Sequence, residues 1–365
     1  MSVNRKVGRV LVTAGGTGGH VFPALAAAKL FQHQGVEVRW IGTRQGIEAD
    51  IVPKNDIKIE YLDVAGVRGQ GILRLLWAPL KIFKAVVDVV CIVRRFKPDL
   101  VLGMGGFVTG PTGVGVWLSG RPVFIHEQNA VAGFTNKVLA RIATRVFQAF
   151  PGAFPASSKV ELTGNPVRAE IMEMGEPVAR YEQHEGAIRV LILGGSQGAV
   201  ALNKLVPNAL AAIKDELSLV VRHQCGAKNM EAATACYRDA GVDADVVPFI
   251  EDMAEAYSWA DIVICRSGAL TVSELAAAGV ASVLIPYPFA VDDHQTRNGE
   301  YLSFAGAAHL VQQETLSETK LAGLLKELLS DRKVLQDMAM KARALAMAGA
   351  TEKLVQRCME VACDQ

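Results

Sequence analysis

Near its start the chain reads Val10-Leu-Val-Thr-Ala-Gly-Gly-Thr-Gly-Gly-His20, a short apolar run that enters a cluster of glycines. The pattern returns in the second half as Val190-Leu-Ile-Leu-Gly-Gly-Ser-Gln-Gly198. A helical pattern follows each cluster, over residues 23–31 and 199–213. A strand, a glycine turn and a helix form the first unit of a doubly wound α/β domain. The sequence therefore predicts an α/β protein with two Rossmann-like domains, each built on a parallel sheet.

Further apolar runs follow at intervals that leave room for helices between strands. They lack the alternation of apolar and polar residues, which is typical of parallel strands covered on both faces. We expect strands at residues 36–41, 100–102, 123–126 and 145–148 in the first half, and at 219–224, 246–248, 262–265, 282–285 and 308–310 in the second.

The length of 365 residues fits two domains, at roughly 150 residues per domain. Between the halves lies a polar stretch, residues 173–186, which we expect to be the interdomain linker. The expected domains span residues 1–166 and 167–348. Two amphipathic helices, residues 319–348 and 351–363, are predicted on either side of Gly349.

The composition excludes several classes of protein. Hydrophobic residues make up 50% of the chain and charged residues 21%, which excludes a disordered chain. The net charge of +1 argues against a nucleic-acid-binding protein. The six cysteines form no CxxC pair, a pattern typical of reduced thiols and not of disulfides or zinc sites. No secretory signal is visible, and the uncharged residues 100–120 indicate a buried strand and a glycine-rich loop, not a membrane span.

The glycine clusters indicate ligand-binding turns. Gly15-Gly-Thr-Gly-Gly19 presents backbone N–H groups at a helix start, and the missing side chains let an anion or a sugar approach closely. A further cluster, Gly103-Met-Gly-Gly-Phe107, favours this interpretation over glycines that serve packing alone. A dinucleotide site fits badly. A GxGxxG match that starts at Gly16 would need a glycine at position 21, where Val21 lies, and no acidic residue ends the second strand. No GxxxxGK[ST] motif exists, which excludes a P-loop.

A second type of turn follows the predicted strand 262–265. It reads Ser267-Gly-Ala-Leu-Thr-Val-Ser-Glu274, in which Ser267 or Thr271 can cap the next helix. The free N–H groups and positive dipole end of that helix suit a diphosphate. Glu274 can accept hydrogen bonds from two ribose hydroxyls, although a carboxylate that only caps the helix would show the same spacing.

Taken in order, these segments closely resemble the MurG family, the bacterial transferases that add N-acetylglucosamine to a lipid-linked muramyl-pentapeptide in peptidoglycan synthesis. The resemblance covers nearly the whole chain and implies the GT-B architecture, in which two Rossmann-like domains face each other across a cleft and the final helix, about 349–365, returns to the first domain. The matching motifs are Gly15-Gly-Thr-Gly-Gly-His20-Val-Phe-Pro23, Gly103-Met-Gly-Gly-Phe107, His126-Glu-Gln-Asn129, Gly164-Asn-Pro-Val-Arg168, Gly194-Gly-Ser-Gln-Gly198, Arg266-Ser-Gly-Ala-Leu-Thr-Val-Ser-Glu274 and Asp293-His-Gln-Thr-Arg-Asn298.

The resemblance also implies substrates and the residues that bind them. The donor would be UDP-N-acetylglucosamine, held mainly on the second domain, and the acceptor an undecaprenyl-diphosphate-linked muramyl-pentapeptide. Glu274 would bind the ribose, and Ile250 and Arg168 the uracil. The remaining implied contacts are Ser196 and the helix start Ala269, Leu270, Thr271, Val272 and Ser273 for the diphosphate region, Gln295 and Asn298 for the sugar hydroxyls, and Thr17, Gly18, Gly19 and Asn129 for the donor sugar or the acceptor.

The family inverts the anomeric carbon, which requires a base to remove the proton of the acceptor's 4-hydroxyl. His20 is our candidate, because it lies at the rim of the first glycine loop and histidine commonly serves as a base near neutral pH. Glu127 is the rival base, or a group that orients acceptor hydroxyls. Helix N-termini and hydroxyls would stabilise the leaving diphosphate, so neither a metal ion nor an organic cofactor is expected.

Basic residues gather in one segment of this otherwise neutral chain. Residues 66–98 hold seven basic residues and one acidic residue. On a helical wheel Lys81 and Lys84 share a stripe with Arg74, Arg95 and Trp77, which suits an anionic membrane surface. We therefore expect Trp77, Lys81 and Lys84 to contact the membrane, although a solvated helix face would have a similar pattern. The resemblance implies peripheral attachment at the cytoplasmic face of the bacterial inner membrane, with cell-wall synthesis proteins as further partners.

Three other functions compete with this one. A UDP-N-acetylglucosamine 2-epimerase shares the architecture and the donor but needs no lipid, so the basic apolar stripe argues against it. An NAD-dependent oxidoreductase is disfavoured by the missing dinucleotide motif. A non-catalytic sensor of sugar nucleotides would keep the donor pocket without turnover.

Overall fold

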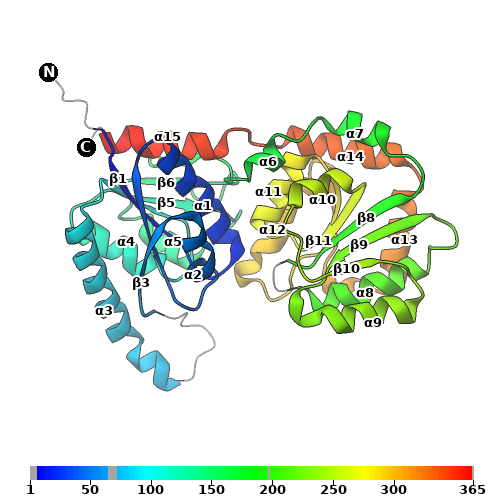
Figure 1. The fold of residues 1–365 in the computed structure, drawn as a ribbon, viewed down its shortest axis with the longest axis horizontal. Helices are drawn as coiled ribbons and strands as arrows, with labels where there is room; N and C mark the ends of the chain where they lie inside the picture. The colour runs from blue at the N-terminus through cyan, green and yellow to red at the C-terminus, as the bar shows by residue number, and fades with distance from the viewer. Residues whose placement is uncertain (1–5, 65–71, 196–197, 364–365) are drawn as a thin grey trace. The chain divides into compact units, whose positions relative to one another are not determined.

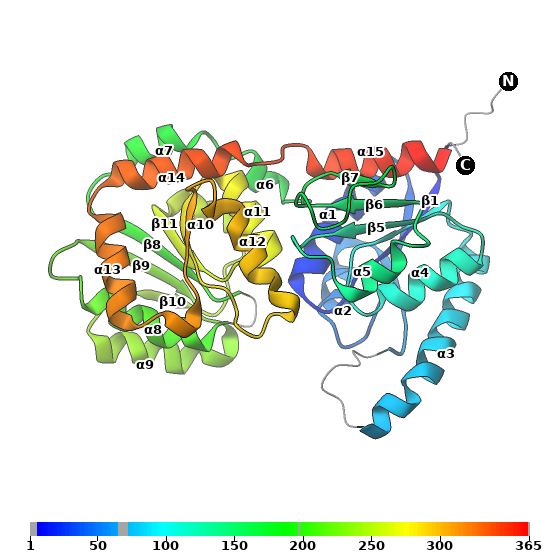
Figure 2. The same cartoon turned by 180° about the vertical axis from the view of Figure 1, so that it is seen from behind.

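The computed structural model describes residues 6–64, 72–195 and 198–363, with the backbone alone for residues 72–78. The chain forms two compact units. Unit 1 consists of Met1–Val167 and Gly349–Gln365, and unit 2 of Arg168–Ala348. In each unit helices cover both faces of one sheet (Figures 1 and 2).

Unit 1 contains a seven-stranded sheet in which every pairing is parallel. The strand order is β3-β2-β1-β4-β5-β6-β7. The strands are β1 (Arg9–Thr13), β2 (Glu37–Gly42), β3 (Lys58–Tyr61), β4 (Leu100–Gly103), β5 (Val123–Glu127), β6 (Arg145–Gln148) and β7 (Val160–Leu162). The helices are α1 (Gly18–His33), α2 (Glu48–Ile51), α3 (Ile72–Phe96), α4 (Thr109–Leu118), α5 (Phe134–Leu139) and α15 (Ala350–Cys363).

Unit 2 repeats the plan with six parallel strands in the order β10-β9-β8-β11-β12-β13. The strands are β8 (Ile188–Leu193), β9 (Leu219–Gln224), β10 (Asp245–Val247), β11 (Ile262–Cys265), β12 (Ala281–Leu284) and β13 (Ala308–Leu310). The helices are α6 (Ala169–Met172), α7 (Pro177–Gln183), α8 (Val200–Ala211), α9 (Met230–Ala240), α10 (Met253–Trp259), α11 (Ala269–Ala278), α12 (His294–Ser303), α13 (Glu318–Leu329) and α14 (Arg332–Ala344).

Both faces of each sheet are buried, which explains the continuous apolar runs in the sequence. In β1, Val10 and Val12 belong to the core beneath α1 and α15, whereas Leu11 belongs to the core on the opposite face. The final helix contributes Leu354 and Cys358 to the first of these cores and lies beside α1 (Figure 1). The predicted strands are confirmed to within one or two residues. The short edge strands of unit 1, β3 and β7, were not among the predicted strands.

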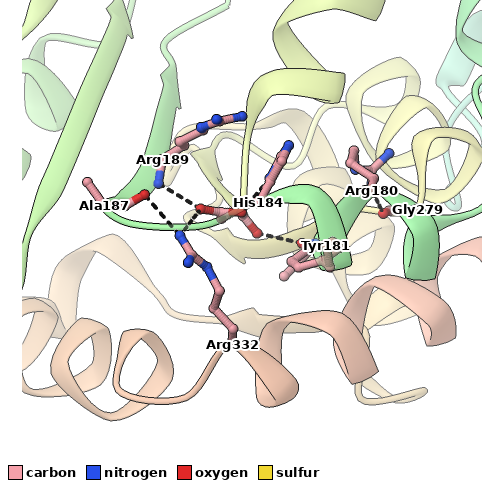
Figure 3. Close-up of polar contacts among 9 residues, drawn as sticks. Arg180, Tyr181, His184, Ala187, Arg189, Gly279 and Arg332 are labelled. Carbon is pink, nitrogen blue, oxygen red and sulfur yellow. Dashed lines mark hydrogen bonds and ion pairs between the residues drawn. The ribbon is translucent and has the colours of Figure 1, made fainter.

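The stretch 173–186 is not a linker, so that prediction is wrong. It forms α7 within unit 2 and buries Tyr181 and His184. The fully buried Asp261 organises this region: its carboxylate accepts hydrogen bonds from the Arg189 N–H at 2.8 Å and from Arg332 at 3.2 Å, and lies 2.7 Å from His184 Nδ1 (Figure 3). The contact of His184 with Asp261 thus holds the end of α7 against the sheet. A polar segment can be buried here because its polar atoms find hydrogen-bond partners inside the protein.

The predicted helix over residues 319–348 is also wrong in its length. Two helices, α13 and α14, replace it. Asp331 separates them, because its side chain caps α14 by accepting a hydrogen bond from the N–H of Lys333 at 2.8 Å. None of the helices in the described part of the chain combines the length and apolarity that a membrane crossing requires.

In both sheets the chain reverses its winding direction between two neighbouring strands. These strands are β1 and β4 in unit 1, and β8 and β11 in unit 2. Ligands of doubly wound sheets bind beyond the carboxyl ends of such strands. Each glycine-rich segment of the sequence follows one of these four strands.

Candidate functional site

Two glycine loops pack against each other in unit 1. We call residues 14–19 the first glycine loop and residues 103–107, the last of the three clusters introduced above, the third glycine loop. They follow β1 and β4, and the N–H of Met104 donates to the carbonyl of Thr13 at 2.8 Å. Gly106 has a φ of +84°, and a Cβ placed on it would lie 2.3 Å from the carbonyl oxygen of Gly15. Only glycine fits at such a contact between two backbones.

Helix α1 starts at this junction without a side-chain cap. Thr17 is the N-cap residue, but its hydroxyl caps nothing. Among the described residues, none accepts a hydrogen bond from the N–H of Gly18 or Gly19. Such N–H groups at the positive end of a helix dipole suit an anionic or sugar oxygen, and binding by Thr17, Gly18 and Gly19 stays a prediction.

His20 lies in the first turn of α1 with its ring against the third glycine loop. Its Nδ1 atom is 3.0 Å from Oε1 of Gln128. A Cβ placed on Gly105 would lie 2.5 Å from the same Nδ1 atom, so the ring occupies space that only a glycine leaves open. The residue is partly buried.

Glu127 is a poorer candidate for the base. Its side chain is 2% exposed, and Oε1 accepts two hydrogen bonds from Asn129, at 3.0 and 3.1 Å. Oε2 accepts from the N–H of Gly133 at 3.0 Å and from Asn136 at 2.9 Å. Four donors fill the hydrogen-bonding capacity of a carboxylate. The geometry therefore gives Glu127 the role of fixing the loop after β5, including Asn129.

Glu48 is a buried carboxylate that was not among the predicted site residues. Its Oε2 accepts from the N–H of Gly16 at 3.1 Å, and its Oε1 accepts from the N–H and the hydroxyl of Thr43 at 2.9 and 2.8 Å. It thereby ties the first glycine loop to the end of β2. The sequence feature that accompanies this contact is Gly46. A Cβ on Gly46 would lie 1.9 Å from the Glu48 carboxylate, so the position needs a glycine.

In unit 2, Glu274 lies in α11 and is 4% exposed. Its Oε1 accepts from Arg168 at 2.8 and 3.2 Å, and its Oε2 accepts from the hydroxyl of Tyr257 at 3.1 Å. Burial, and then the charge of Glu274, raise the pKa of Tyr257 well above its usual value, so the phenol keeps its proton and donates. The structure thus brings together two predicted residues, Arg168 and Glu274, with Tyr257, which the sequence did not indicate.

Helix α11 has Gly268 as its N-cap residue, with no side-chain cap. The prediction that Ser267 or Thr271 caps this helix is therefore wrong. The hydroxyl of Ser273 donates to the carbonyl of Ala269 at 2.9 Å, and the N–H of Val272 donates to the carbonyl of Gly268. Leu270 and Thr271 remain in the first turn, half-buried. An uncapped helix start of this kind suits an anion.

The glycine turn after β8 is held by Gln224, which was not among the predicted site residues. Its Nε2 donates to the carbonyl of Gly195 at 3.0 Å, and its Oε1 accepts from the N–H of Ile250 at 2.9 Å. Gln224 therefore connects the predicted uracil-binding residue Ile250 to the turn. Ser196 lies outside the described residues.

The two predicted sugar ligands of α12 differ in their surroundings. Gln295 is half-buried, and its Oε1 accepts from the N–H of Tyr287 at 2.9 Å. Asn298 is fully buried, and its Nδ2 donates to the carbonyl of Ser267 at 3.2 Å. Asn298 thereby supports the segment before α11, while Gln295 lies nearer to solvent.

The middle of α3 carries an exposed apolar and basic surface. Leu80 is 64% and Phe83 is 69% exposed, and Lys81 and Lys84 are exposed between and beside them. Figure 2 shows the N-terminal end of α3, which precedes this surface in the chain, projecting from the rest of unit 1. The side chain of Trp77 lies outside the described residues. Across those residues, no group of three or more His, Cys, Asp or Glu side chains is arranged to hold a metal ion.

Comparisons with known proteins agree with this arrangement. Residues 10–148 match the glycosyltransferase family 28 N-terminal domain, and residues 189–354 match the C-terminal domain of the same family. A Marinobacter nauticus protein is 52% identical over 97% of this chain and 98% of its own, and a Pseudomonas fluorescens protein is 53% identical over 97% and 98%. The crystal structure of Acinetobacter baumannii MurG is 46% identical, with a TM-score of 0.84 over 97% of this chain and 99% of that one.

The chain belongs to the MurG group of glycosyltransferase family 28. The family resemblance is confirmed, and with it the GT-B fold class and the assignment as a glycosyltransferase. Both named relatives are described as UDP-N-acetylglucosamine–N-acetylmuramyl-(pentapeptide) pyrophosphoryl-undecaprenol N-acetylglucosamine transferases. A UDP-GlcNAc 2-epimerase from Neisseria meningitidis has a TM-score of 0.67 at 15% identity over 96% of this chain and 100% of that one, which is a likeness of fold alone.

Proposed function

We propose that this enzyme transfers N-acetylglucosamine from UDP-N-acetylglucosamine to the 4-hydroxyl of a lipid-linked N-acetylmuramyl-pentapeptide, with inversion at the anomeric carbon. The observation that carries the proposal is identity above 50% over nearly the whole chain to transferases named for this reaction. The positions of the motif residues at the carboxyl ends of the strands support it.

The donor contacts belong to unit 2 in this proposal. Glu274 accepts hydrogen bonds from the ribose, the start of α11 stabilises the diphosphate, and Arg168 and Ile250 contact the uracil. Gln295 binds a sugar hydroxyl through its Nε2, because its Oε1 already accepts from Tyr287. The helix dipole of α11 favours the charge that develops on the leaving UDP.

His20 of unit 1 is the proposed base. The acceptor oxygen attacks the anomeric carbon as the bond from that carbon to the UDP oxygen breaks. His20 takes the proton of the attacking hydroxyl, and UDP leaves with the electron pair of the broken bond. Gly18 and Gly19 offer N–H groups beside the base for a sugar or phosphate oxygen.

An acceptor-dependent assay tests this function. The protein is incubated with labelled UDP-N-acetylglucosamine, with and without the muramyl-pentapeptide lipid, and UDP release is measured. We expect release only with the acceptor, and a fall of about 10²–10⁴-fold for His20→Ala with donor affinity nearly unchanged. The exposed His33→Ala variant serves as the control. Acceptor-independent conversion of the donor to its C2 epimer would identify an epimerase, and full turnover by His20→Ala would remove His20 from the mechanism.

We also propose that α3 attaches the enzyme peripherally to the cytoplasmic face of the inner membrane. Exposed Leu80 and Phe83 offer apolar surface to the bilayer, and Lys81 and Lys84 offer charge to anionic headgroups, at about 1 kcal/mol per cation. Arg95 contributes less, because it forms an ion pair with Glu60 at 2.7 Å.

Flotation with anionic vesicles tests this attachment. We expect binding at low salt that high salt weakens, and at least about a 30-fold loss of binding for the double variant Lys81→Glu/Lys84→Glu, because two cations worth about 1 kcal/mol each are removed. The control is Lys29→Glu/Lys58→Glu, which changes the net charge equally at two exposed sites outside α3. An equal loss in both double variants would indicate general charge attraction and contradict a specific role of α3.

A further inference from the structure

We infer that Gln128 is a positioning residue that fixes the tautomer of His20, so that Nδ1 carries the proton and Nε2 is the atom that accepts one from the acceptor. Gln128 follows Glu127 at the end of β5 and is 1% exposed. The inference deepens the proposed function, since its catalytic meaning requires His20 to be the base.

The orientation of the Gln128 amide follows from its partners. Its Nε2 donates to the carbonyl of Met104 at 2.8 Å. The flipped amide would place two carbonyl oxygens against each other, because a backbone carbonyl can only accept. Oε1 of Gln128 must therefore face His20, where it lies 3.0 Å from Nδ1.

This orientation determines which ring nitrogen of His20 holds the proton. A neutral imidazole has one nitrogen that donates and one that accepts. An amide oxygen can only accept, so the contact with Gln128 requires a proton on Nδ1. Nε2 is then left with its lone pair, and no described residue donates to it or accepts from it. A base needs such a lone pair.

The surroundings hold both side chains in this arrangement. Gly105 has a φ of +99° and leaves the space in which the His20 ring lies. The backbone carbonyl of Gln128 accepts from Asn165 at 3.1 Å, which ties β5 to the segment before unit 2. The contact between His20 and Gln128 thus joins the first glycine loop, the third glycine loop and β5.

The test is a direct measurement of the tautomer in the full-length protein. Two-bond ¹H–¹⁵N correlation spectra of protein labelled with ¹⁵N-histidine separate protonated from bare ring nitrogens, and His20→Ala identifies the His20 signals among the seven histidines. We expect His20 protonated at Nδ1 in the wild type and in Gln128→Glu, which keeps the acceptor. Gln128→Met, which lacks it, should show the Nε2–H tautomer. Its kcat should fall about 10–100-fold, while KM for the donor changes less than twofold.

A matched control is Gln148→Met. Gln148 is a buried glutamine at the end of the neighbouring strand β6, where its Oε1 accepts from the N–H of Phe154 at 3.0 Å. It should leave the His20 tautomer unchanged. A wild-type His20 protonated at Nε2, or an unchanged tautomer in Gln128→Met, would overturn the inference. Whether His20 is the base is tested separately. That question is answered by the turnover of His20→Ala, whereas the tautomer is answered by the spectra.

Discussion

The buried carboxylates of Glu127 and Glu274 differ in how many further hydrogen bonds they can accept. Glu127 receives three donors from the loop after β5 and one from Asn136 of α5, which together fill its carboxylate. Glu274 receives three from described residues, two of them from Arg168. A ribose hydroxyl can add to Glu274 directly, and a second can replace one Arg168 donor. Both residues were selected from the sequence, yet only the side-chain contacts separate a structural carboxylate from one with remaining capacity.

The contacts of Glu274 predict the effect of removing its charge. Glu274→Gln should weaken UDP binding about 10–100-fold, because it replaces one acceptor oxygen by a donor and removes the negative charge that faces the half-buried Arg168. Tyr257→Phe should weaken binding less, since Arg168 still pairs with the carboxylate. Isothermal titration calorimetry with UDP measures both. Glu255→Gln, an exposed glutamate of the same unit, is the control. Unchanged UDP affinity in Glu274→Gln would exclude Glu274 from the donor site.

At the scale of elements, the glycine loops work as a pair. The sequence indicated each loop separately, but the parallel order of β1 and β4 makes them neighbours. Their contact is between backbones, so the close approach at Gly106 depends on a missing Cβ and on a positive φ together. Such a contact leaves no pattern in the sequence beyond the glycines themselves.

This contact can be tested with two glycines that have nearly the same positive φ, Gly106 and Gly152. Gly106→Ala should destabilise the protein by about 2–4 kcal/mol and reduce turnover more than tenfold, because it strains φ and separates the loops. Gly152→Ala is the matched control, since Gly152 has a φ of +85° and nothing within 4 Å of its Cβ position. It should lose only about 1–2 kcal/mol and keep its activity. Urea unfolding and the transfer assay measure the two effects, and equal losses would refute a specific role for the loop contact.

At the scale of the whole molecule, each unit has a fully buried histidine in a central strand of its sheet, His126 in β5 and His223 in β9. Burial lowers the pKa of His126 in unit 1 and of His223 in unit 2 to about 4. His126 lies 2.9 Å from the carbonyl of Gly164, and His223 lies between Tyr237 and Asn203 at 2.9 and 3.1 Å. The free energy of unfolding of both units therefore depends on pH, because each histidine binds a proton more readily in the unfolded chain than in the folded unit.

The sign of this dependence follows from the lowered pKa values. Above pH 6.5 both histidines are neutral in the folded and unfolded states, so their contribution is complete. As the pH falls from 6.5 to 4, the unfolded chain binds protons that the folded units exclude, and each histidine costs up to about 3 kcal/mol of unfolding free energy. Urea midpoints at pH 7.5, 6 and 5 should fall in order, and the fall should be smaller for His126→Gln and for His223→Gln. The exposed His33→Gln should keep the full dependence, and identical slopes in all four proteins would contradict this account.

The sequence by itself determined the fold class, the central strands and the family, because apolar runs without alternation, glycine turns and ordered motifs are local patterns. Together with the family resemblance it also indicated Thr17, His20, Arg168 and Glu274 as site residues, and these roles stay predictions. It misjudged residues 173–186, since a polar segment that is buried by pairing with Asp261 has the composition of a linker.

The tertiary structure alone decided which of these residues act together. Gln128, Glu48, Tyr257 and Gln224 are ordinary residues in the sequence, and they acquire their roles only through partners that lie far along the chain. The choice between His20 and Glu127 as base depends on hydrogen-bond directions in the same way. Hydrogen bonds are short and directional, so their pattern depends on how strands and loops meet in space and is not encoded in any one segment.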